Sequence, residues 1–356
     1  MEKRLFQSVG VEAVVLSNPA NMRYVAGFTG EGYIYLSEKK KVVVTDSRYV
    51  IAARQECRDY EIVEWGPSGY FAPLADCIGQ EGKEMTLGIE DEGLTLAMYR
   101  KMTEQLQKIE GISVEYVELG HKVSDLRQIK TKEEHKLLRM AEAIGDRAFA
   151  KTLPHIKAGV TEKKIAAWLE FYMKEEGAEA FSFETIAASG KNSAMPHAVP
   201  TDKKLEDGDF LTMDFGCVFH GYCSDMTRTV VIGRANERQK QIYNTVLRAQ
   251  ETALKGLRSG MTGKEIDALA RNVITDAGYG AAFGHSLGHS VGLEIHERPN
   301  FSVKEETIIQ PGMVITVEPG IYIDGFGGVR IEDVVIVTET GCENITHSPK
   351  ELIECQ

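Results

Sequence analysis

Two aspartates near the ends of neighbouring apolar runs could together hold a cation. Asp214 lies in FLTMDFG and Asp225 lies in GYCSDMTRTVVI. A tight turn around Phe219–Gly221, folded between residues 219 and 220, would make a hairpin with Asp214 opposite Asp225 and their side chains about 5 Å apart. Carboxylates so placed repel each other unless a positive charge lies between them, so the pattern favours a bound divalent cation. The alternative is that both aspartates face solvent.

Three histidines lie in one glycine-rich segment, FGHSLGHSVGLEIHE (283–297). Its glycines make a helix costly, so His285 and His289 need not share a helical face although they are four residues apart. Glycine at this density instead lets the backbone pass close to a ligand. With His296 as the third histidine, the segment indicates a binding or catalytic site.

Two glutamates lie inside strand-like apolar runs, Glu318 in VITVEPGIYI and Glu332 in GGVRIEDVVIV. A buried carboxylate must be paired, protonated or bound to a metal. Two aspartates, two glutamates and one histidine form a ligand set that favours Mn²⁺, Co²⁺ or Zn²⁺ bound by oxygen and nitrogen atoms over a structural zinc site with thiolate ligands. Such a set suffices for two divalent ions, which can activate a bridging water for hydrolysis.

The segments GHSLG and GHSVG also match G-x-S-x-G, the nucleophile motif of serine hydrolases, with Ser286 or Ser290 as the nucleophile. That motif needs an apolar strand before it and a long helix after it, and the flanking GYGAAF and LEIHERPN provide neither. A triad would have to use Glu318 or Asp324 with His347. A serine hydrolase therefore stays as an alternative interpretation of this segment.

The elements that would position these residues divide into two regions. The first third of the chain alternates short runs rich in Val, Ile and Tyr with helical spacing, which is an α/β pattern. Turn residues such as Asn18, Pro19 and Gly30 separate the runs. The expected strands are 11–17, 32–37, 41–46, 87–90 and 113–118, and the expected helices are 48–57 and 94–109.

A second region begins at a capping box, in which a Thr131 oxygen and a Glu134 carboxylate would bind the free N–H groups of a helix start. The helix should run to about Leu153. Gly177 and Gly278 are at positions where a residue with left-handed backbone conformation would end two further helices. Those further helices are expected over 161–176, 236–257 and 262–277.

An internal repeat appears in this second region. The segment KAGVTEKKIAAW (157–168) aligns with RSGMTGKEIDAL (258–269), and Gly177 then aligns with Gly278. The period is far longer than that of solenoid repeats, so the sequence predicts a duplicated domain with a pseudo-twofold axis. The alternative is a chance likeness of two amphipathic helices.

Charge and composition exclude several classes of protein. The 356 residues include 53 acidic and 41 basic side chains, a net charge of −12 that argues against a nucleic-acid binder. The six cysteines form no C-x-x-C pair, and no stretch approaches the ~18 apolar residues of a membrane span. Without a signal-peptide pattern at the start, we expect a cytoplasmic protein with no membrane partner.

Taken together, these motifs resemble the creatinase, aminopeptidase P and prolidase branch of the pita-bread metallopeptidases. Four segments carry the resemblance in order: SFETIAASGKNSAMPHAVPTDKKLEDGDFLTMDFG, FGHSLGHSVGLEIHE, VEPGIYI and GGVRIED; the linker DLRQIKTKEEHKLLRMA is also similar. The resemblance implies an α/β creatinase-like N-terminal domain over 1–122. It also implies an α+β pita-bread catalytic domain over 123–356, consistent with the duplication.

The resemblance also assigns roles to residues of this chain. The metal ligands would be Asp214, Asp225, His289, Glu318 and Glu332, which would hold two divalent ions, with Mn²⁺ the first choice and Co²⁺ or Zn²⁺ next. The catalytic residues would be His197, His285, His296, Glu318 and Arg330. The substrate-binding residues would be His197, His296 and Tyr322.

The activity implied is hydrolysis of the peptide bond before proline, by a hydroxide held between two metal ions. The substrate would be a small peptide with proline in second position, and the enzyme would be a homodimer. Prolidases of this branch tend to carry an Arg after HE-x-P, where HERPN has Asn300 with Arg298 two residues earlier, so dipeptidase and aminopeptidase both stay open. A catalytically inactive pita-bread binding module is a further alternative.

Overall fold

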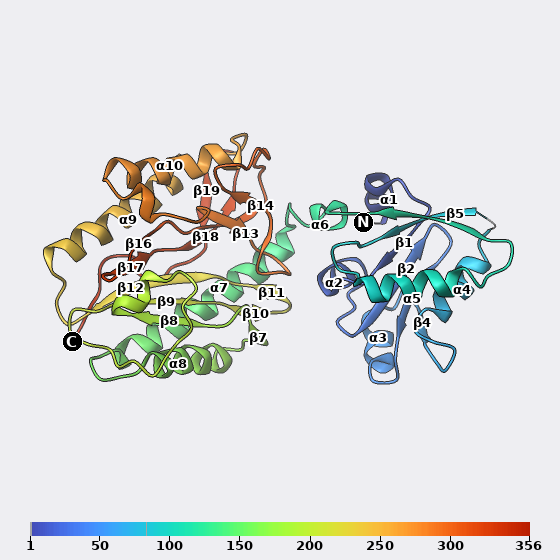
Figure 1. Cartoon of the computed structure of the whole chain (residues 1–356), viewed down its shortest axis with the longest axis horizontal. Helices are drawn as coiled ribbons and strands as arrows, with labels where there is room; N and C mark the ends of the chain where they lie inside the picture. The colour runs from blue at the N-terminus through green and yellow to red at the C-terminus, as the bar shows by residue number, and fades with distance from the viewer. Residues whose placement is uncertain (1, 83) are drawn as a thin grey trace. The chain divides into compact units, whose positions relative to one another are not determined.

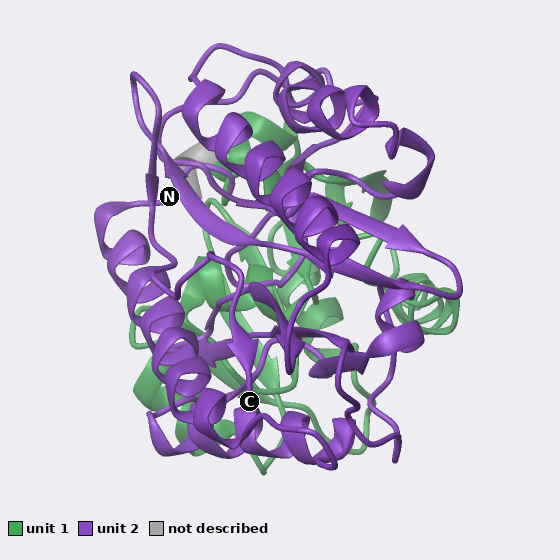
Figure 2. Ribbon diagram, turned by 90° about the vertical axis from the view of Figure 1, so that its left-hand side faces the viewer, with its two compact units in different colours: residues 1–127 green, residues 128–356 purple. Residues whose placement is uncertain are grey.

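The computed structural model describes residues 2–82 and 84–356. The chain forms two compact units, Met1–Arg127 and Gln128–Gln356 (Figure 2). The division falls a few residues after the boundary at 122 and 123 expected from the sequence, because the short helix α6 (Lys122–Asp125) belongs to the first unit.

The first unit is built on one six-stranded mixed sheet with the strand order β4-β3-β2-β1-β5-β6. Strand β1 pairs antiparallel with β2 and parallel with β5. Four of the five expected strands correspond closely to β1, β2, β3 and β6, and the fifth, expected over 87–90, overlaps the second half of β5. Strand β4 was not expected. The strands are β1 (Ala13–Leu16), β2 (Gly32–Ser37), β3 (Lys41–Thr45), β4 (Glu61–Glu64), β5 (Glu84–Ile89) and β6 (Ser113–Glu118).

Helices cover both faces of this sheet, since alternate strand residues belong to two separate cores. On one face Val15 and Tyr35 pack with Leu74 of α4 and Met102 of α5. On the other face, the core includes residues of α1, α2, α3 and α6. The remaining helices are α1 (Glu2–Val9), α2 (Pro19–Ala26), α3 (Val50–Glu56), α4 (Ala72–Gly79) and α5 (Leu96–Leu106).

One turn expected from the sequence is instead a helix start. Asn18 accepts hydrogen bonds from the backbone N–H groups of Ala20 and Asn21, and Pro19 occupies the first position of α2. Asn as N-cap and Pro at the first helical position are the residues preferred there. The same two residue types mark a turn and a helix start, so their local signal was ambiguous.

Four long helices of the second unit match the expected ranges to within one or two residues. They are α7 (Lys132–Thr152), α8 (Glu162–Glu175), α9 (Glu237–Gly256) and α10 (Gly263–Asp276). Thr131 and Glu134 form the predicted capping box of α7, and Thr262 with Glu265 forms another at α10. Gly177 and Gly278 adopt positive φ after α8 and α10, as predicted. None of the described helices combines the length and apolar character that a membrane span requires.

Two larger sheets lie between these helices, with the orders β20-β12-β9-β8 and β14-β13-β15-β18-β19 (Figure 1). The first contains β8 (Ile186–Ser189), β9 (Phe210–Phe215), β12 (Met226–Ile232) and β20 (Glu354–Cys355). The second contains β13 (Gly288–Ser290), β14 (Glu297–Phe301), β15 (Val314–Val317), β18 (Asp333–Val337) and β19 (Cys342–Asn344). Smaller strands complete the unit: β7 (Ala180–Phe181), β10 (Cys217–Phe219), β11 (Tyr222–Cys223), β16 (Gly320–Ile323) and β17 (Gly327–Arg330).

The predicted duplication is present in the structure. Strands β8-β9-β12 occur in the same spatial order as β13-β15-β18, each set following a pair of long helices. The hydrogen bonds repeat as well: Gly159 N–H donates to the Leu205 carbonyl, and Gly260 N–H donates to the Ile309 carbonyl. Aligned residues therefore make equivalent contacts, which chance likeness of two helices would not produce.

Alternation along the strands separates the core from a polar interior. In β9, Leu211, Met213 and Phe215 pack in the core that contains residues of α7 and α8. The intervening Thr212 and Asp214 therefore lie on the opposite face. In β15, Ile315 and Val317 pack in the core of α9 and α10. The polar side chains are thus directed away from the helices in both halves.

Candidate metal centre and its pocket

A cavity of about 750 Å³ in the second unit collects most of the residues expected to do chemistry. All five predicted metal ligands line it, and so do the three predicted catalytic histidines and Arg330. The rest of its wall is largely apolar. The lining also includes Phe183, Glu184, Thr185, Ile186, Pro196, Ala198, Val199, Pro200, Ser286, Gly288, Ile295 and Asn300.

The two aspartates come from a hairpin, but in a different register from the one expected. Asp214 lies opposite Thr227. The turn has His220 and Gly221 at its centre, both with positive φ, as a two-residue hairpin turn of type I′ requires. The expected register was wrong by two residues, and a shift of two keeps every side chain on its face. Asp225 is therefore a diagonal neighbour of Asp214 on the same side.

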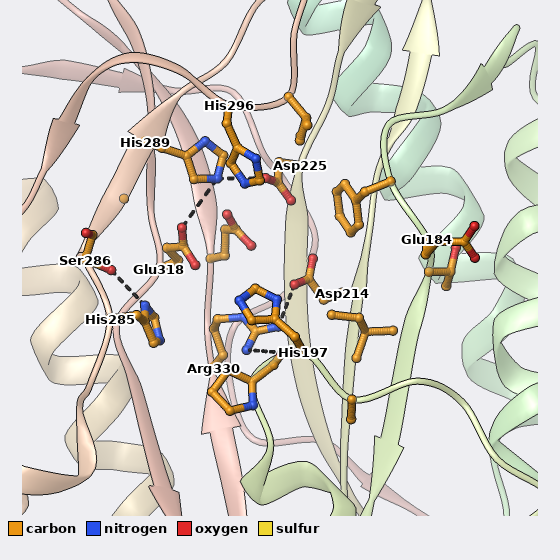
Figure 3. A pocket seen from close by; sticks show the side chains of 18 of the residues that line it. Glu184, His197, Asp214, Asp225, His285, Ser286, His289, His296, Glu318 and Arg330 are labelled. Carbon is orange, nitrogen blue, oxygen red and sulfur yellow. Dashed lines mark hydrogen bonds and ion pairs between the residues drawn. The ribbon is translucent and has the colours of Figure 1, made fainter.

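His289, Asp225 and Glu318 lie next to one another in the cavity, and Asp214 lies between Asp225 and Arg330 (Figure 3). One ligand atom each from Asp225, His289 and Glu332 lie within 4.8 Å of one another. The His289 Nε2 atom is 3.3 Å from Asp225 Oδ2 and 3.6 Å from Glu318 Oε1. The His289 Nδ1 atom is 3.2 Å from the Ser290 carbonyl oxygen, which fixes the ring with Nε2 facing the carboxylates. Imidazole nitrogen and carboxylate oxygen are suitable ligands for Mn²⁺, Co²⁺ and Zn²⁺.

Two of the predicted ligands have a buried carboxylate oxygen without a hydrogen-bond partner among the described residues, namely Asp214 Oδ1 and Glu332 Oε1. Burial together with the nearby Asp214 and Glu318 charges raises the pKa of Asp225 well above its usual range. Burial likewise raises the pKa values of Glu318 and Glu332. Unpartnered oxygens and crowded carboxylates are what divalent cations would stabilise, so the residues present fit such ions.

Arg330 braces this group of carboxylates. Its Nη2 donates to Asp214 Oδ2 at 2.5 Å, and its Nε donates to Thr227 Oγ1 at 2.9 Å. The Thr227 hydroxyl in turn donates to Glu332 Oε2 at 2.7 Å. One guanidinium therefore fixes the orientation of two carboxylates, one directly and one through a hydroxyl.

Tyr322 and His285 extend this bracing. Arg330 Nη1 donates to the Tyr322 hydroxyl at 2.7 Å, and that hydroxyl lies 3.0 Å from His285 Nε2. Burial, with the nearby Arg330 charge, lowers the pKa of His285 to about 4. The Nε2 atom of neutral His285 can then accept a hydrogen bond from the Tyr322 hydroxyl. Tyr322, expected from the resemblance to bind substrate, is not among the lining residues, and its hydroxyl is engaged by Arg330 and His285.

The two remaining histidines face the cavity (Figure 3). The centroids of the His296 and His289 rings are 4.4 Å apart. His197 belongs to a segment, with Pro196 before it, that lines the cavity wall. Partial loss of solvation, together with His289 and His197, lowers the pKa of His296. A neutral imidazole beside the ligands is suited to hydrogen bonding with a polar group of a bound molecule.

Three further residues contribute to the site although sequence reasoning did not identify them. Thr316 Oγ1 donates to Glu318 Oε1 at 3.2 Å and accepts from the His289 backbone N–H at 2.9 Å. Glu142, on α7, accepts from the Asp225 backbone N–H at 2.8 Å. The third is Thr227, two residues after Asp225. The alternation of side chains from Asp225 to Thr227 was a signal that could have identified Thr227. Glu142 lies 83 residues before Asp225 in the chain, and its sequence context gave no such signal.

The serine hydrolase interpretation is not supported by the geometry. Ser290 is 0% exposed, and its hydroxyl donates to the Pro299 carbonyl oxygen at 2.6 Å. His347, which a triad would need, is exposed and does not line the cavity that contains Ser286.

The chain matches two protein families that together span almost its whole length. Residues 3–129 match the creatinase/prolidase N-terminal domain, and residues 136–339 match metallopeptidase family M24. These matches confirm the expected two-domain architecture.

Relatives and solved structures are similar along nearly the full chain. An Xaa-Pro dipeptidase of Pyrococcus furiosus is 40% identical over 96% of this chain and 95% of its own. The structure of an Xaa-Pro dipeptidase from Bacillus anthracis is 44% identical, with a TM-score of 0.94 over 99% of this chain and 98% of that one. An X-Pro aminopeptidase from Thermotoga maritima is 38% identical, with a TM-score of 0.90 over 99% of both chains.

Proposed function

Because the chain belongs to metallopeptidase family M24, we propose that it is a metallo-exopeptidase that hydrolyses the bond before proline in Xaa-Pro dipeptides or short Xaa-Pro peptides. The observation that carries the proposal is the set of five ligand side chains lining one cavity, two of them with buried oxygens that lack partners. The names of the Pyrococcus, Bacillus and Thermotoga proteins support the proline specificity.

Five residues would hold the metal: Asp214, Asp225, His289, Glu318 and Glu332. Two divalent ions there would polarise the peptide carbonyl and lower the pKa of a water molecule into the neutral range. We favour Mn²⁺, with Co²⁺ or Zn²⁺ as alternatives, since oxygen-rich ligand sets accept all three. Arg330 would keep Asp214 oriented through Oδ2, and Oδ1, which has no hydrogen-bond partner, would be available as a metal ligand.

The other lining residues would bind and orient the substrate. His296 and His197 face the cavity and can donate hydrogen bonds to the oxygen on which negative charge develops. Glu318 can carry a proton from the attacking water to the prolyl nitrogen, which must be protonated to leave. The apolar wall, which includes Phe183, Ile186 and Ile295, can receive the proline ring, which has no N–H to be recognised.

A hydrolysis panel tests this function. The purified protein, stripped of metal and reloaded separately with Mn²⁺, Co²⁺ or Zn²⁺, should cleave Xaa-Pro peptides and not the matched Xaa-Ala peptides. Full activity after metal removal would disprove the metal-dependent reaction. Cleavage of Xaa-Ala at an equal rate would disprove the proline specificity.

Two further expectations belong to this proposal. All six cysteines are free, which supports a reducing compartment such as the cytoplasm, to be tested by cell fractionation. The expected homodimer is tested by light scattering of the purified full-length protein.

A further inference from the structure

The predicted catalytic residue His197 lies on the connection between β8 and β9, residues 189–201, which we call the His197 loop (Figure 3). Residues 196–200 of this loop are consecutive in the chain, and all of them line the cavity. His197 is exposed, so little packing holds its ring in place. Its position therefore depends on how the backbone of the loop is fixed.

Both ends of the His197 loop are bound to one carboxylate, that of Glu162 at the start of α8. Glu162 is 0% exposed. At the beginning of the loop, its Oε1 accepts the Ser189 backbone N–H at 2.7 Å and the Ser189 hydroxyl at 2.8 Å. At the end of the loop, its Oε2 accepts the Thr201 backbone N–H at 3.0 Å and the Thr201 hydroxyl at 2.5 Å. The Asn192 amide donates to both oxygens, at 3.0 and 3.2 Å.

The Glu162 side chain is not needed to begin α8. Thr161 caps this helix by accepting the Lys164 N–H. Burial raises the pKa of Glu162, but the hydrogen bonds from Thr201 and Ser189 outweigh burial and hold the pKa below its usual range. A charged carboxylate is costly to bury unless donors surround it, so Glu162 and the His197 loop depend on each other.

The second copy of the duplication shows what this carboxylate adds. Gly263 aligns with Glu162. The Glu162 backbone N–H donates to the Lys203 carbonyl oxygen, and the Gly263 N–H donates in the same way to that of Thr307. A side chain at Gly263 would collide with the backbone of β14. The backbone connection thus forms without a carboxylate in the second copy, and the bonds of Glu162 are specific to the loop that carries His197.

We propose that Glu162 is a positioning residue: its carboxylate holds both ends of the His197 loop and thereby places the His197 ring against the substrate. This rests on the proposed function, in which His197 donates a hydrogen bond to the substrate. The predicted metal ligands all lie outside residues 189–201. Disturbing Glu162 should therefore slow the reaction without releasing metal.

Glu162→Gln tests the proposal with little change of shape. The NH₂ group that replaces one oxygen would face other donors, so one end of the His197 loop would lose its acceptor. For the metal-loaded full-length enzyme on Xaa-Pro peptides, we expect kcat/KM to fall about 10–100-fold, because a small misplacement of a catalytic group can cost that much. Metal content per chain should stay at the wild-type value.

Glu90→Gln is the matched control. Glu90 is 5% exposed, belongs to the first unit and does not line the cavity. Its carboxylate likewise accepts two backbone N–H groups and an asparagine amide, from Ser17, Asn18 and Asn21. This variant should keep wild-type kcat/KM and metal content. An equal loss in both variants would overturn the specific role of Glu162.

A double-mutant cycle separates positioning of His197 from a general loss of structure. All variants are compared at a temperature at which circular dichroism shows them folded. In a His197→Ala background, Glu162→Gln should lower kcat/KM by less than about threefold, since the residue on which it acts is gone. The same fold-loss in both backgrounds would overturn the proposal, and so would an unchanged kcat/KM in the single variant.

Two variants of Thr201 decide the matter if Glu162→Gln does not fold. Thr201 is exposed, so its substitution leaves no cavity. Thr201→Val removes the hydroxyl that donates to Glu162 and should lower kcat/KM about fivefold, whereas Thr201→Ser keeps the hydroxyl and should match wild type. Equal values for Val and Ser would overturn the proposal. If the wild-type enzyme cleaved no Xaa-Pro peptide with any metal, the proposed function itself would be wrong, a result distinct from an active enzyme that is insensitive to Glu162.

Discussion

Arg330 and Asp214 form a one-sided ion pair. The guanidinium donates to Asp214 Oδ2 at 2.5 Å, while Oδ1 of the same carboxylate is buried with no hydrogen-bond partner. The arginine therefore orients the carboxylate and leaves one oxygen available to a cation.

Replacing Arg330 with Lys should weaken the site without removing its charge. A lysine can reach one partner but cannot bind Asp214, Thr227 and Tyr322 together, because it lacks the planar fork. We expect a loss of about 10–100-fold in metal affinity, measured by calorimetry, with a similar loss in kcat/KM. Arg139→Lys, in an exposed ion pair with Glu343, is the control and should change neither. Unchanged metal affinity in the Arg330 variant would contradict the bracing role.

Asp225→Asn should remove a metal ligand while keeping the shape of the side chain. Its carboxylate is 3.3 Å from His289 Nε2 and within the group formed with Glu332. We expect less bound metal per chain and a fall in kcat of roughly 10³-fold, since metal ions supply several kcal/mol of transition-state stabilisation. Metal content is measured by mass spectrometry. Asp324→Asn, at an exposed turn position, should keep full metal content.

The metal-free protein should lose stability as pH rises. Burial raises the pKa values of Asp225, Glu318 and Glu332 in the folded state, so that state binds more protons than the unfolded chain once pH exceeds the ordinary carboxyl range. The free energy of unfolding then falls with increasing pH until the raised pKa values are passed. Bound metal would neutralise the buried carboxylates and so remove this pH-dependent loss of stability. The metal-induced rise in Tm should therefore be larger at about pH 8 than at about pH 5. A metal-free Tm that increases over this range would contradict the prediction.

Glu142 should be replaceable by Gln but not by Leu. It is 1% exposed, and burial raises its pKa to about 8, so near neutral pH it is largely protonated and resembles an amide. Glu142→Gln keeps an acceptor for the Asp225 N–H, whereas Glu142→Leu leaves that N–H and the Thr346 hydroxyl without their partner. Urea unfolding should show a loss of about 1–3 kcal/mol per unsatisfied group for Leu, and a much smaller loss for Gln. Equal losses would show that Glu142 acts through packing.

Ser286→Ala separates the metallopeptidase from the serine hydrolase. Ser286 lines the cavity, but the ligands that would activate water are elsewhere in it. The variant should keep kcat within about tenfold of wild type, whereas a chelator should abolish activity. A serine-directed covalent inhibitor should leave the protein unlabelled at Ser286, as checked by mass spectrometry.

The sequence predicted elements whose signals are local. Thr131 and Glu134 sit within one turn of each other, so the start of α7 could be predicted from a few residues. Helix α4 has no side-chain cap at Phe71 and was not predicted. The four carboxylate ligands were identified because charged residues in apolar runs are unusual, and this signal can be seen without knowing which residues they contact.

Contacts between distant segments could not be predicted in the same way. The register of the Asp214 hairpin depends on which two residues take positive φ in the turn, and His220 carries no strong preference for that conformation. The role of Tyr322 depends on Arg330 and His285, which reach it from β17 and from the segment before β13. Such contacts are a property of packing, and single-sequence spacing does not encode them.

The internal duplication gives the metal a mechanical role. Asp214 and Asp225 belong to the first copy, and His289, Glu318 and Glu332 belong to the second. Ions held by all five would cross-link the two copies, so metal affinity would include the free energy of keeping them docked. By thermodynamic linkage, a substitution that loosens the contact between the copies should release metal, even far from every ligand.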